Sequence, residues 1–185
     1  MVTPRCPADA ARRAVRLALV VTDNDGVLTD GTVYVAATGE HMKAYSVRDG
    51  MGVERLRERG IATGVLTREP PDLIAPRAGK LALGHLWTGV RDKHAQLGRI
   101  LDDTGVGLDQ LAYIGDDVND LGILEAIGEV GLTAAPADAM PEVRDAVHYI
   151  CSAPGGRGAF REVAEWLLRL RTQAEVHHEE RRQDR

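Results

Sequence analysis

The chain has 185 residues, of which 44% are hydrophobic and 28% charged, a balance typical of a folded globular domain. Its formal net charge is −5 without a basic cluster, which argues against nucleic acid as the main partner. No apolar run reaches the roughly 18 residues of a membrane span, and the first residues lack the apolar core of a secretory signal. Cys6 and Cys151 form no spacing motif, so we expect a cytoplasmic protein with reduced thiols.

Short apolar runs alternate with amphipathic runs along the chain. Runs that are apolar on both faces, as buried parallel strands are, lie at 16–21, 61–66, 110–115, 129–134 and 147–151. Helical patterns lie at 53–60, 70–80, 94–101, 119–128 and 157–170. This alternation predicts an α/β fold with a doubly wound, mostly parallel, Rossmann-like sheet, whose site lies beyond the carboxyl ends of the strands.

One segment breaks the alternation. Residues 32–47 have the pattern of two strands about a Thr-Gly turn, which predicts a β-hairpin that projects from the sheet. We therefore divide the chain into an N-terminal extension (1–15), one domain (16–171) and a polar tail (172–185) that we expect to be disordered.

Acidic residues gather at predicted strand ends. Asp23 and Asp25 follow the first strand, and Gly26 permits the chain to turn there. Later come Thr67 at the end of a strand, Lys93 near a helix start, and an acidic group after another strand, comprising Asp116, Asp117 and Asp120. Any one of these groups is a common structural feature, since an Asp often caps a helix and a Lys is usually solvated. Their order predicts that all of them meet at one edge of the sheet.

Clustered carboxylates repel one another unless a positive charge lies among them. Mg²⁺ suits such a cluster because it takes oxygen ligands and keeps waters that a phosphate can replace. The Thr67 hydroxyl and the Lys93 ammonium suit phosphate oxygens. A carboxylate can also be a covalent nucleophile, as in aspartyl-phosphate chemistry.

The four groups "DNDGVLTDG", Thr67, Lys93 and "GDDVND" resemble the motifs of the haloacid dehalogenase (HAD) superfamily of phosphohydrolases. "KAYSVRDGMGV", "AYIGDDVNDL" and "GGRGAFREV" further resemble the branch that dephosphorylates 2-keto-3-deoxy sugar acids, which includes 3-deoxy-octulosonate 8-phosphate and nononate (sialic-acid type) 9-phosphate phosphatases. The resemblance covers about residues 17–170.

The resemblance implies a role for each matching residue. Asp23 would attack phosphorus and become the phosphoaspartate, and Asp25 would protonate the leaving oxygen and then activate water. Mg²⁺ would be held by the Asp23 carboxylate, the Asp25 backbone carbonyl and Asp116. Thr67 and Lys93 would bind the phosphoryl group. Three residues would support the metal ligands without binding the ion themselves: Asp117, Asn119 and Asp120. Asp120 could instead orient Lys93.

The resemblance also concerns closure of the site. Larger superfamily members carry a cap domain, but no insert of that size fits in this sequence. Related capless phosphatases are tetramers in which a neighbour covers the site, so a homotetramer is implied, with Val33, Val35 and Tyr45 of the hairpin at its interface. Candidate substrate contacts are Arg48, Asp49, Gly156 and Arg157; for Arg48 an ion pair with Asp49 or Glu54 is an equal alternative.

One departure bears on the substrate. Octulosonate phosphatases usually have Thr-Gly-Arg where this chain has Thr67-Arg68-Glu69. Glu69 is more typical of the nononate type and could accept hydrogen bonds from substrate hydroxyls, so the sequence favours a nine-carbon over an eight-carbon acid. We count Arg68 and Glu69 as substrate-binding candidates.

Two other functions stay open at this stage. A phosphorelay receiver domain also contains an acidic pocket, a Thr and a Lys, but its phosphoacceptor ends a later strand. A non-catalytic phosphatase-like domain could instead serve oligomerisation next to a sugar-acid-activating enzyme; the intact set of polar residues argues against this.

Overall fold

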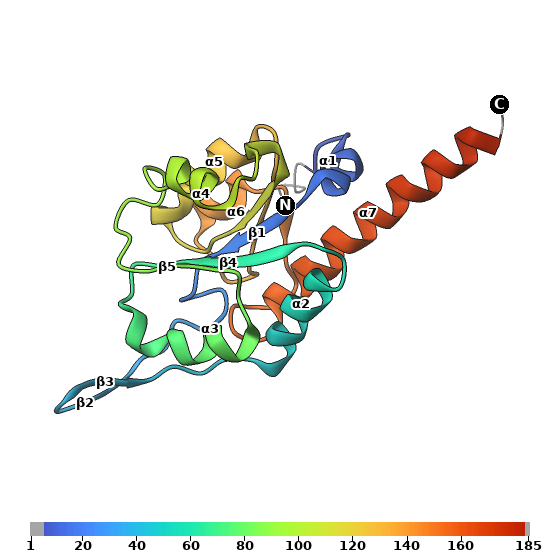
Figure 1. Cartoon of the computed structure of the whole chain (residues 1–185). Helices are drawn as coiled ribbons and strands as arrows, with labels where there is room; N and C mark the ends of the chain where they lie inside the picture. The colour runs from blue at the N-terminus through green and yellow to red at the C-terminus, as the bar shows by residue number, and fades with distance from the viewer. Residues whose placement is uncertain (1–5, 184–185) are drawn as a thin grey trace.

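A computed structural model describes residues 6–183, apart from the side chains of 41 and 177–183. At its centre is a six-stranded parallel sheet with the strand order β5-β4-β1-β6-β7-β8. Figure 1 labels three of these strands, β5, β4 and β1. The strands are β1 (Leu19–Thr22), β4 (Ala62–Leu66), β5 (His85–Trp87), β6 (Leu111–Ile114), β7 (Leu132–Ala135) and β8 (Tyr149–Ile150). The predicted doubly wound α/β fold is thus confirmed.

Helices cover both faces of the sheet. One face packs against α1 (Ala10–Arg16), α2 (Val47–Arg57), α3 (Ala75–Leu81) and α7 (Ala159–Gln183). The other packs against α4 (Leu97–Thr104), α5 (Leu121–Gly128) and α6 (Pro141–Ala146). Three short 3₁₀ turns complete the described elements: η1 (Pro71–Leu73), η2 (Leu108–Gln110) and η3 (Val118–Asp120).

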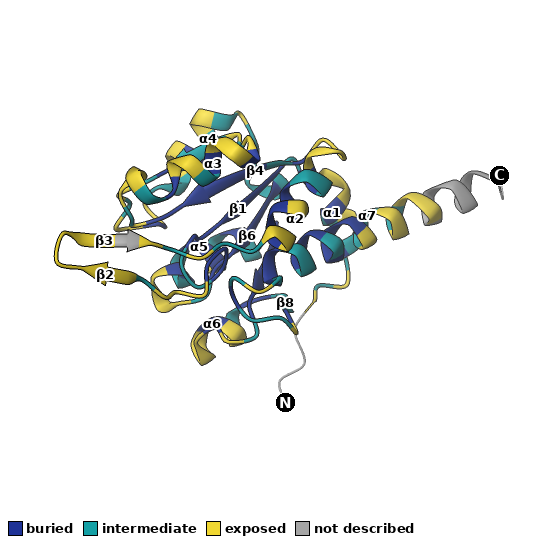
Figure 2. Ribbon diagram, turned by 90° about the horizontal axis from the view of Figure 1, so that it is seen from below, coloured by how far each residue is buried: buried dark blue, intermediate teal, exposed yellow. Residues whose placement is uncertain are grey.

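The central strand shows why the sheet is buried on both sides. In β1, Val20 belongs to the core on the α2/α7 face, whereas Leu19 and Val21 belong to the core on the α4/α5 face. All four β1 residues are buried (Figure 2), which is the alternation that a strand between two helical layers requires. The carboxyl ends of β1, β4 and β6 consequently lie together at one rigid edge.

The hairpin projects from the body of the molecule, as predicted (Figure 1). Its strands, β2 (Tyr34–Ala36) and β3 (Gly39–Met42), are shorter than the predicted 32–47 segment. The segment ends early because the Ser46 hydroxyl accepts hydrogen bonds from the backbone N–H groups of Arg48 and Asp49, which starts α2. Within the described residues only this hairpin and α2 lie between β1 and β4, so no cap domain is inserted there.

Both predicted end segments need correction. Residues 10–16 form α1, which packs against α7 and so belongs to the domain. The predicted disordered tail is helical as far as Gln183, because α7 continues through a run of good helix formers and gains an ion pair between Arg171 and Glu175 (3.5 Å). Residues 1–5 and 184–185 of these two segments lie outside the described residues.

Two further differences are small. β5 was not predicted, because a three-residue strand is too short to show a periodic pattern. The helix predicted at 94–101 begins only at Leu97, after a turn that contains Lys93. Across residues 6–183, no helix combines the length and the apolarity that crossing a bilayer demands.

Candidate active site

Asp23 lies at the carboxyl end of β1. Its backbone N–H donates to the carbonyl of Ile114 in β6 (2.9 Å), so the sheet itself fixes its position. One carboxylate oxygen, Oδ1, accepts the backbone N–H of Asn24 at 2.7 Å, and the residue is buried. A carboxylate held this way presents Oδ2 in a fixed direction.

Lys93 joins two carboxylates. Its Nζ lies 2.6 Å from Asp23 Oδ2 and 2.7 Å from Asp120 Oδ1. Burial opposes the ammonium charge, but the two carboxylates outweigh it and raise the pKa of Lys93. Tyr113, fully buried in β6, also donates to Asp120 Oδ1 at 2.6 Å.

Asp120 has no oxygen left for a metal ion. Oδ1 accepts from Lys93 and Tyr113, and Oδ2 accepts the backbone N–H groups of Asp116 (3.1 Å) and Asp117 (3.4 Å). These four donors match the roughly four lone-pair positions of a carboxylate. Asp120 therefore orients Lys93 and shapes the loop after β6.

The remaining carboxylates suit a divalent cation. A carboxylate oxygen of Asp23 and one of Asp116 lie within 4.8 Å of each other. Asp116 Oδ1 is buried without a hydrogen-bond partner in the part of the chain that the structure describes. A buried carboxylate oxygen without a donor is costly unless a cation approaches it, so Asp23 and Asp116 fit the expected Mg²⁺.

Two carboxyl groups of this cluster have raised pKa values. Burial, with the charges of Asp23 and Asp120 adding to it, raises the pKa of Asp116 to about 8. Burial also raises the pKa of Asp23 to about 7, although Lys93 opposes the rise. A cation bound among these carboxylates would oppose both rises and favour the ionised forms.

Asp25 is held by three side-chain donors. Oδ1 accepts from Asn24 Nδ2 and Thr29 Oγ1, both at 3.1 Å, and Oδ2 accepts from Lys43 Nζ at 2.7 Å. Lys43 follows β3 at the base of the hairpin, and its side chain is 2% exposed. The same ammonium lies 3.0 Å from Glu69 Oε2.

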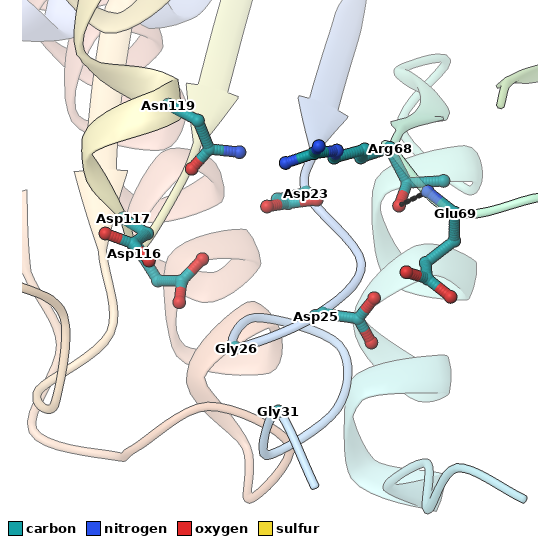
Figure 3. A pocket seen from close by; sticks show the side chains of 10 residues that line it. Asp23, Asp25, Gly26, Gly31, Arg68, Glu69, Asp116, Asp117 and Asn119 are labelled. Carbon is teal, nitrogen blue, oxygen red and sulfur yellow. Dashed lines mark hydrogen bonds between the residues drawn. The ribbon is translucent and has the colours of Figure 1, made fainter. Parts of the chain in front are cut away.

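One pocket of about 290 Å³ lies at this edge of the sheet (Figure 3). It is lined by Asp23, Asp25, Gly26, Gly31, Thr67, Arg68, Glu69, Asp116, Asp117 and Asn119. Arg68 extends across the pocket mouth from the β4 side toward Asn119. Thr67 is buried, and its Oγ1 accepts the backbone N–H of Glu69 at 3.1 Å. Asp23, Thr67 and Asp116, which are distant in the sequence, thus meet at this edge of the sheet as predicted.

The sequence and the fold of this chain are similar to those of proteins of known kind. No family model matches the chain. The 3-deoxy-D-manno-octulosonate 8-phosphate phosphatase of Yersinia pestis is 38% identical over 160 residues, which are 86% of this chain and 84% of that protein. The Escherichia coli K12 protein of the same name is 35% identical over 161 residues, 87% of this chain and 84% of that one.

The chain belongs to the 3-deoxy-D-manno-octulosonate 8-phosphate phosphatase family. A solved structure of this phosphatase from Moraxella catarrhalis, in complex with magnesium ion, phosphate ion and KDO, superposes with a TM-score of 0.82 at 30% identity, covering 91% of this chain and 95% of that one. The cobalt-bound Haemophilus influenzae protein gives a TM-score of 0.81 at 35% identity, covering 89% and 94%. These similarities confirm the predicted HAD-like fold.

In this octulosonate phosphatase family member, Gly26 allows two loops to meet. Its φ is +78°, and a Cβ at this position would overlap the Asp116 carboxylate. Gly156 (φ +65°) donates its backbone N–H to the Val27 carbonyl at 2.9 Å, and a Cβ there would overlap the Thr29–Asp30 backbone. The 155–158 loop therefore braces the loop that carries Asp23 and Asp25.

Four predicted substrate contacts do not line the pocket: Gly156, whose role in the loop is described above, and Asp49, Arg48 and Arg157. Asp49 is buried, and its carboxylate accepts the backbone N–H groups of Gly158 (3.1 Å) and Arg161 (3.0 Å), so it caps α7 within the protomer. Arg48 is exposed on the first turn of α2. Arg157 is exposed too, and its guanidinium lies 3.6 Å from Asp30.

Sequence reasoning missed two residues that organise the site of this family member. Lys43 opens the segment "KAYSVRDGMGV" at the hairpin exit, but the family resemblance of that segment assigned no role to this lysine. Tyr113 looked like a core residue of a strand, because periodicity cannot show where a hydroxyl points.

Proposed function

We propose that this protein is a Mg²⁺-dependent phosphatase that hydrolyses a phosphorylated 2-keto-3-deoxy sugar acid through a phosphoaspartate on Asp23. The observation that carries the proposal is the joint placement of Asp23, Lys93 and Asp116 at one sheet edge, next to Asp25. The relatives are phosphatases of an octulosonate 8-phosphate, which supports the substrate class.

In the first step, an Asp23 carboxylate oxygen forms a bond to phosphorus while the bond from phosphorus to the sugar oxygen breaks. The electron pair goes to that sugar oxygen, which takes a proton from Asp25. In the second step, a water oxygen forms a bond to phosphorus while the bond from phosphorus to the Asp23 oxygen breaks, and its electron pair returns to Asp23. The water gives a proton to Asp25, so phosphate is released, Asp23 is again a carboxylate and Asp25 is again protonated.

Asp23, Asp116 and the Asp25 backbone carbonyl would hold Mg²⁺, which would neutralise charge on the transferring phosphoryl group. Lys93 and the Thr67 hydroxyl would bind phosphoryl oxygens from the protein side. Asp117 and Asn119, which line the same pocket, would support the metal side. Positioning and charge neutralisation are the main catalytic contributions expected for a loose phosphoryl transition state.

We further propose that Arg68 binds the phosphoryl group. Among the described side chains that line the pocket it is the one cation, and five carboxylates line the same pocket. It occupies a position where octulosonate phosphatases usually have glycine. A guanidinium gives phosphate charge-assisted hydrogen bonds without needing a buried site.

The substrate's chain length rests on two observations. The relatives named above favour the eight-carbon octulosonate 8-phosphate. Glu69, which lines the pocket and is held by Lys43, instead suits hydroxyl groups of a nine-carbon nononate. We propose octulosonate 8-phosphate as the first substrate to test and a nononate 9-phosphate as the second.

Self-association would complete the site. Tyr34, Val35 and Met42 of the hairpin are exposed, Val35 to 73%, and large apolar side chains gathered on a projecting hairpin favour a protein partner. Tyr45 is half-buried, and its hydroxyl donates to Asn24 Oδ1 (3.1 Å) within the protomer. In the proposed homotetramer, Arg48, Gly156 and Arg157 could contact a neighbour's substrate; Val35→Glu should then lower the mass measured by light scattering.

A phosphate-release assay tests the function. The wild-type protein with Mg²⁺ should hydrolyse one of the two sugar-acid phosphates faster than simple sugar phosphates. Asp23→Asn should lower turnover by at least about 10³-fold, because no nucleophile remains; Asp72→Asn, at an exposed residue, is the matched control. A stable phosphoprotein without turnover would indicate a receiver domain, and no reaction at all a non-catalytic scaffold.

A further inference from the structure

We propose that Lys43 is a positioning residue that holds Asp25 for proton transfer to the leaving group; this inference rests on the proposed function. Lys43 comes from the hairpin exit, whereas Asp25 follows β1 and Glu69 follows β4. Its ammonium lies 2.7 Å from Asp25 Oδ2 and 3.0 Å from Glu69 Oε2. One buried cation thus ties three separate segments together beside the pocket.

The hydrogen-bond pattern shows what Lys43 does to Asp25. A carboxylate offers about four lone-pair positions. Asn24 and Thr29 donate to the two on Oδ1, and Lys43 donates to one of the two on Oδ2. One lone-pair position on Oδ2 is left free. The proton that Asp25 transfers would therefore be bound to Oδ2, which is the oxygen that Lys43 orients.

Lys43 cannot act on the substrate directly. Its side chain is 2% exposed and does not line the pocket, whereas Asp25 and Glu69 do. Two of its three N–H donors are already directed to those carboxylates. Without Lys43, Asp25 could rotate and its like-charged neighbour Glu69 would repel it.

Comparing two substrates with different leaving groups can show whether Lys43 positions Asp25 or only stabilises the fold. An alkyl phosphate such as octulosonate 8-phosphate needs a proton on its leaving oxygen, whereas p-nitrophenyl phosphate releases a stable phenolate that needs none. The ratio kcat/KM reports the steps up to loss of the leaving group. We expect Lys43→Met to lower kcat/KM about 10²-fold for the sugar-acid phosphate and only a few-fold for p-nitrophenyl phosphate.

A double-mutant cycle tests whether Lys43 acts through Asp25. In an Asp25→Asn background, Lys43→Met should cause little additional loss on the alkyl ester, because the proton donor is already absent. Arg99→Met, which removes an exposed cation from α4, is the matched control and should leave both esters unchanged. If Lys43→Met does not fold, Lys43→Gln keeps a donor and carries the same expectation with a smaller contrast.

Two results would overturn the inference. One is an equal fall in kcat/KM for both esters, which indicates a general loss of structure. The other is unchanged hydrolysis of both. Neither touches the proposed function, which fails only if the wild-type protein releases no phosphate or if Asp23→Asn does so at the wild-type rate.

Discussion

Lys93 Nζ lies 2.6 Å from Asp23 Oδ2, with 1% of the lysine side chain exposed. A buried ion pair of this kind costs desolvation energy and is kept only where its charges are used or fully paired. Here the lysine faces the carboxylate that ends the central strand and a second one, Asp120, that Tyr113 anchors. The pair therefore places a fixed positive charge beside the proposed nucleophile.

Replacing Lys93 by Met should lower kcat by at least about 10²-fold, because one charge-stabilising donor at the phosphoryl site is removed. It also leaves Asp23, Asp116 and Asp120 without their buried cation, so the Mg²⁺-free protein should melt at a lower temperature. Steady-state kinetics and differential scanning fluorimetry measure the two effects, with Arg99→Met as the control. Activity within threefold of wild type would contradict the placement of the phosphoryl group next to Lys93.

Mg²⁺ affinity should rise with pH. The pKa of Asp116 is raised to about 8, so below that pH the ion must displace a proton. A raised folded-state pKa stabilises the metal-free protein at low pH, and this contribution is lost as pH rises toward about 8. At 100 times its dissociation constant, Mg²⁺ should add about 2.7 kcal/mol, or roughly 5–10 °C in Tm.

Mg²⁺ titrations followed by the melting temperature at about pH 6, 7.5 and 9 measure this dependence. Asp116→Asn should weaken binding and remove most of the pH effect. An affinity that stays constant over this range in the wild-type protein would show that Asp116 does not exchange a proton for the ion.

Changing Arg68 to Gly restores the residue that octulosonate phosphatases usually carry. Losing a charge-assisted hydrogen bond of about 1.5–3 kcal/mol should raise KM and the inhibition constant of inorganic phosphate by about 10- to 100-fold. The kcat should change less, because the guanidinium binds the phosphoryl group before and during reaction. Inhibition by inorganic phosphate that is as strong in the variant as in the wild type would remove Arg68 from the site.

Asp49→Ala should destabilise the fold rather than weaken substrate binding. It leaves the backbone N–H groups of Gly158 and Arg161 without their acceptor at the start of α7. A loss of about 1–3 kcal/mol corresponds to a Tm fall of roughly 2–10 °C. Asp72→Ala is the exposed control, and a rise in KM at unchanged Tm would restore Asp49 as a substrate contact.

The sheet and the position of the candidate site could be predicted from the sequence. Strands buried on both faces produce continuous apolar runs, so the sheet was predictable, and parallel strands bring their carboxyl ends together. That rule predicted that Asp23, Thr67 and Asp116 meet at one edge of the sheet, and the structure shows them in one pocket. Where patterns were short or polar, at β5 and in the last turns of α7, the prediction failed because local periodicity carries little signal there.

The sequence by itself determined the fold class and the set of acidic, hydroxyl and ammonium groups at the sheet edge, because hydrophobic periodicity and strand order act through the backbone. Only the tertiary structure decided that Asp120 serves Lys93, that Asp49 caps α7, and that Lys43 holds Asp25 and Glu69. These roles depend on side-chain directions and on contacts between segments distant in the chain, and a residue pattern contains neither.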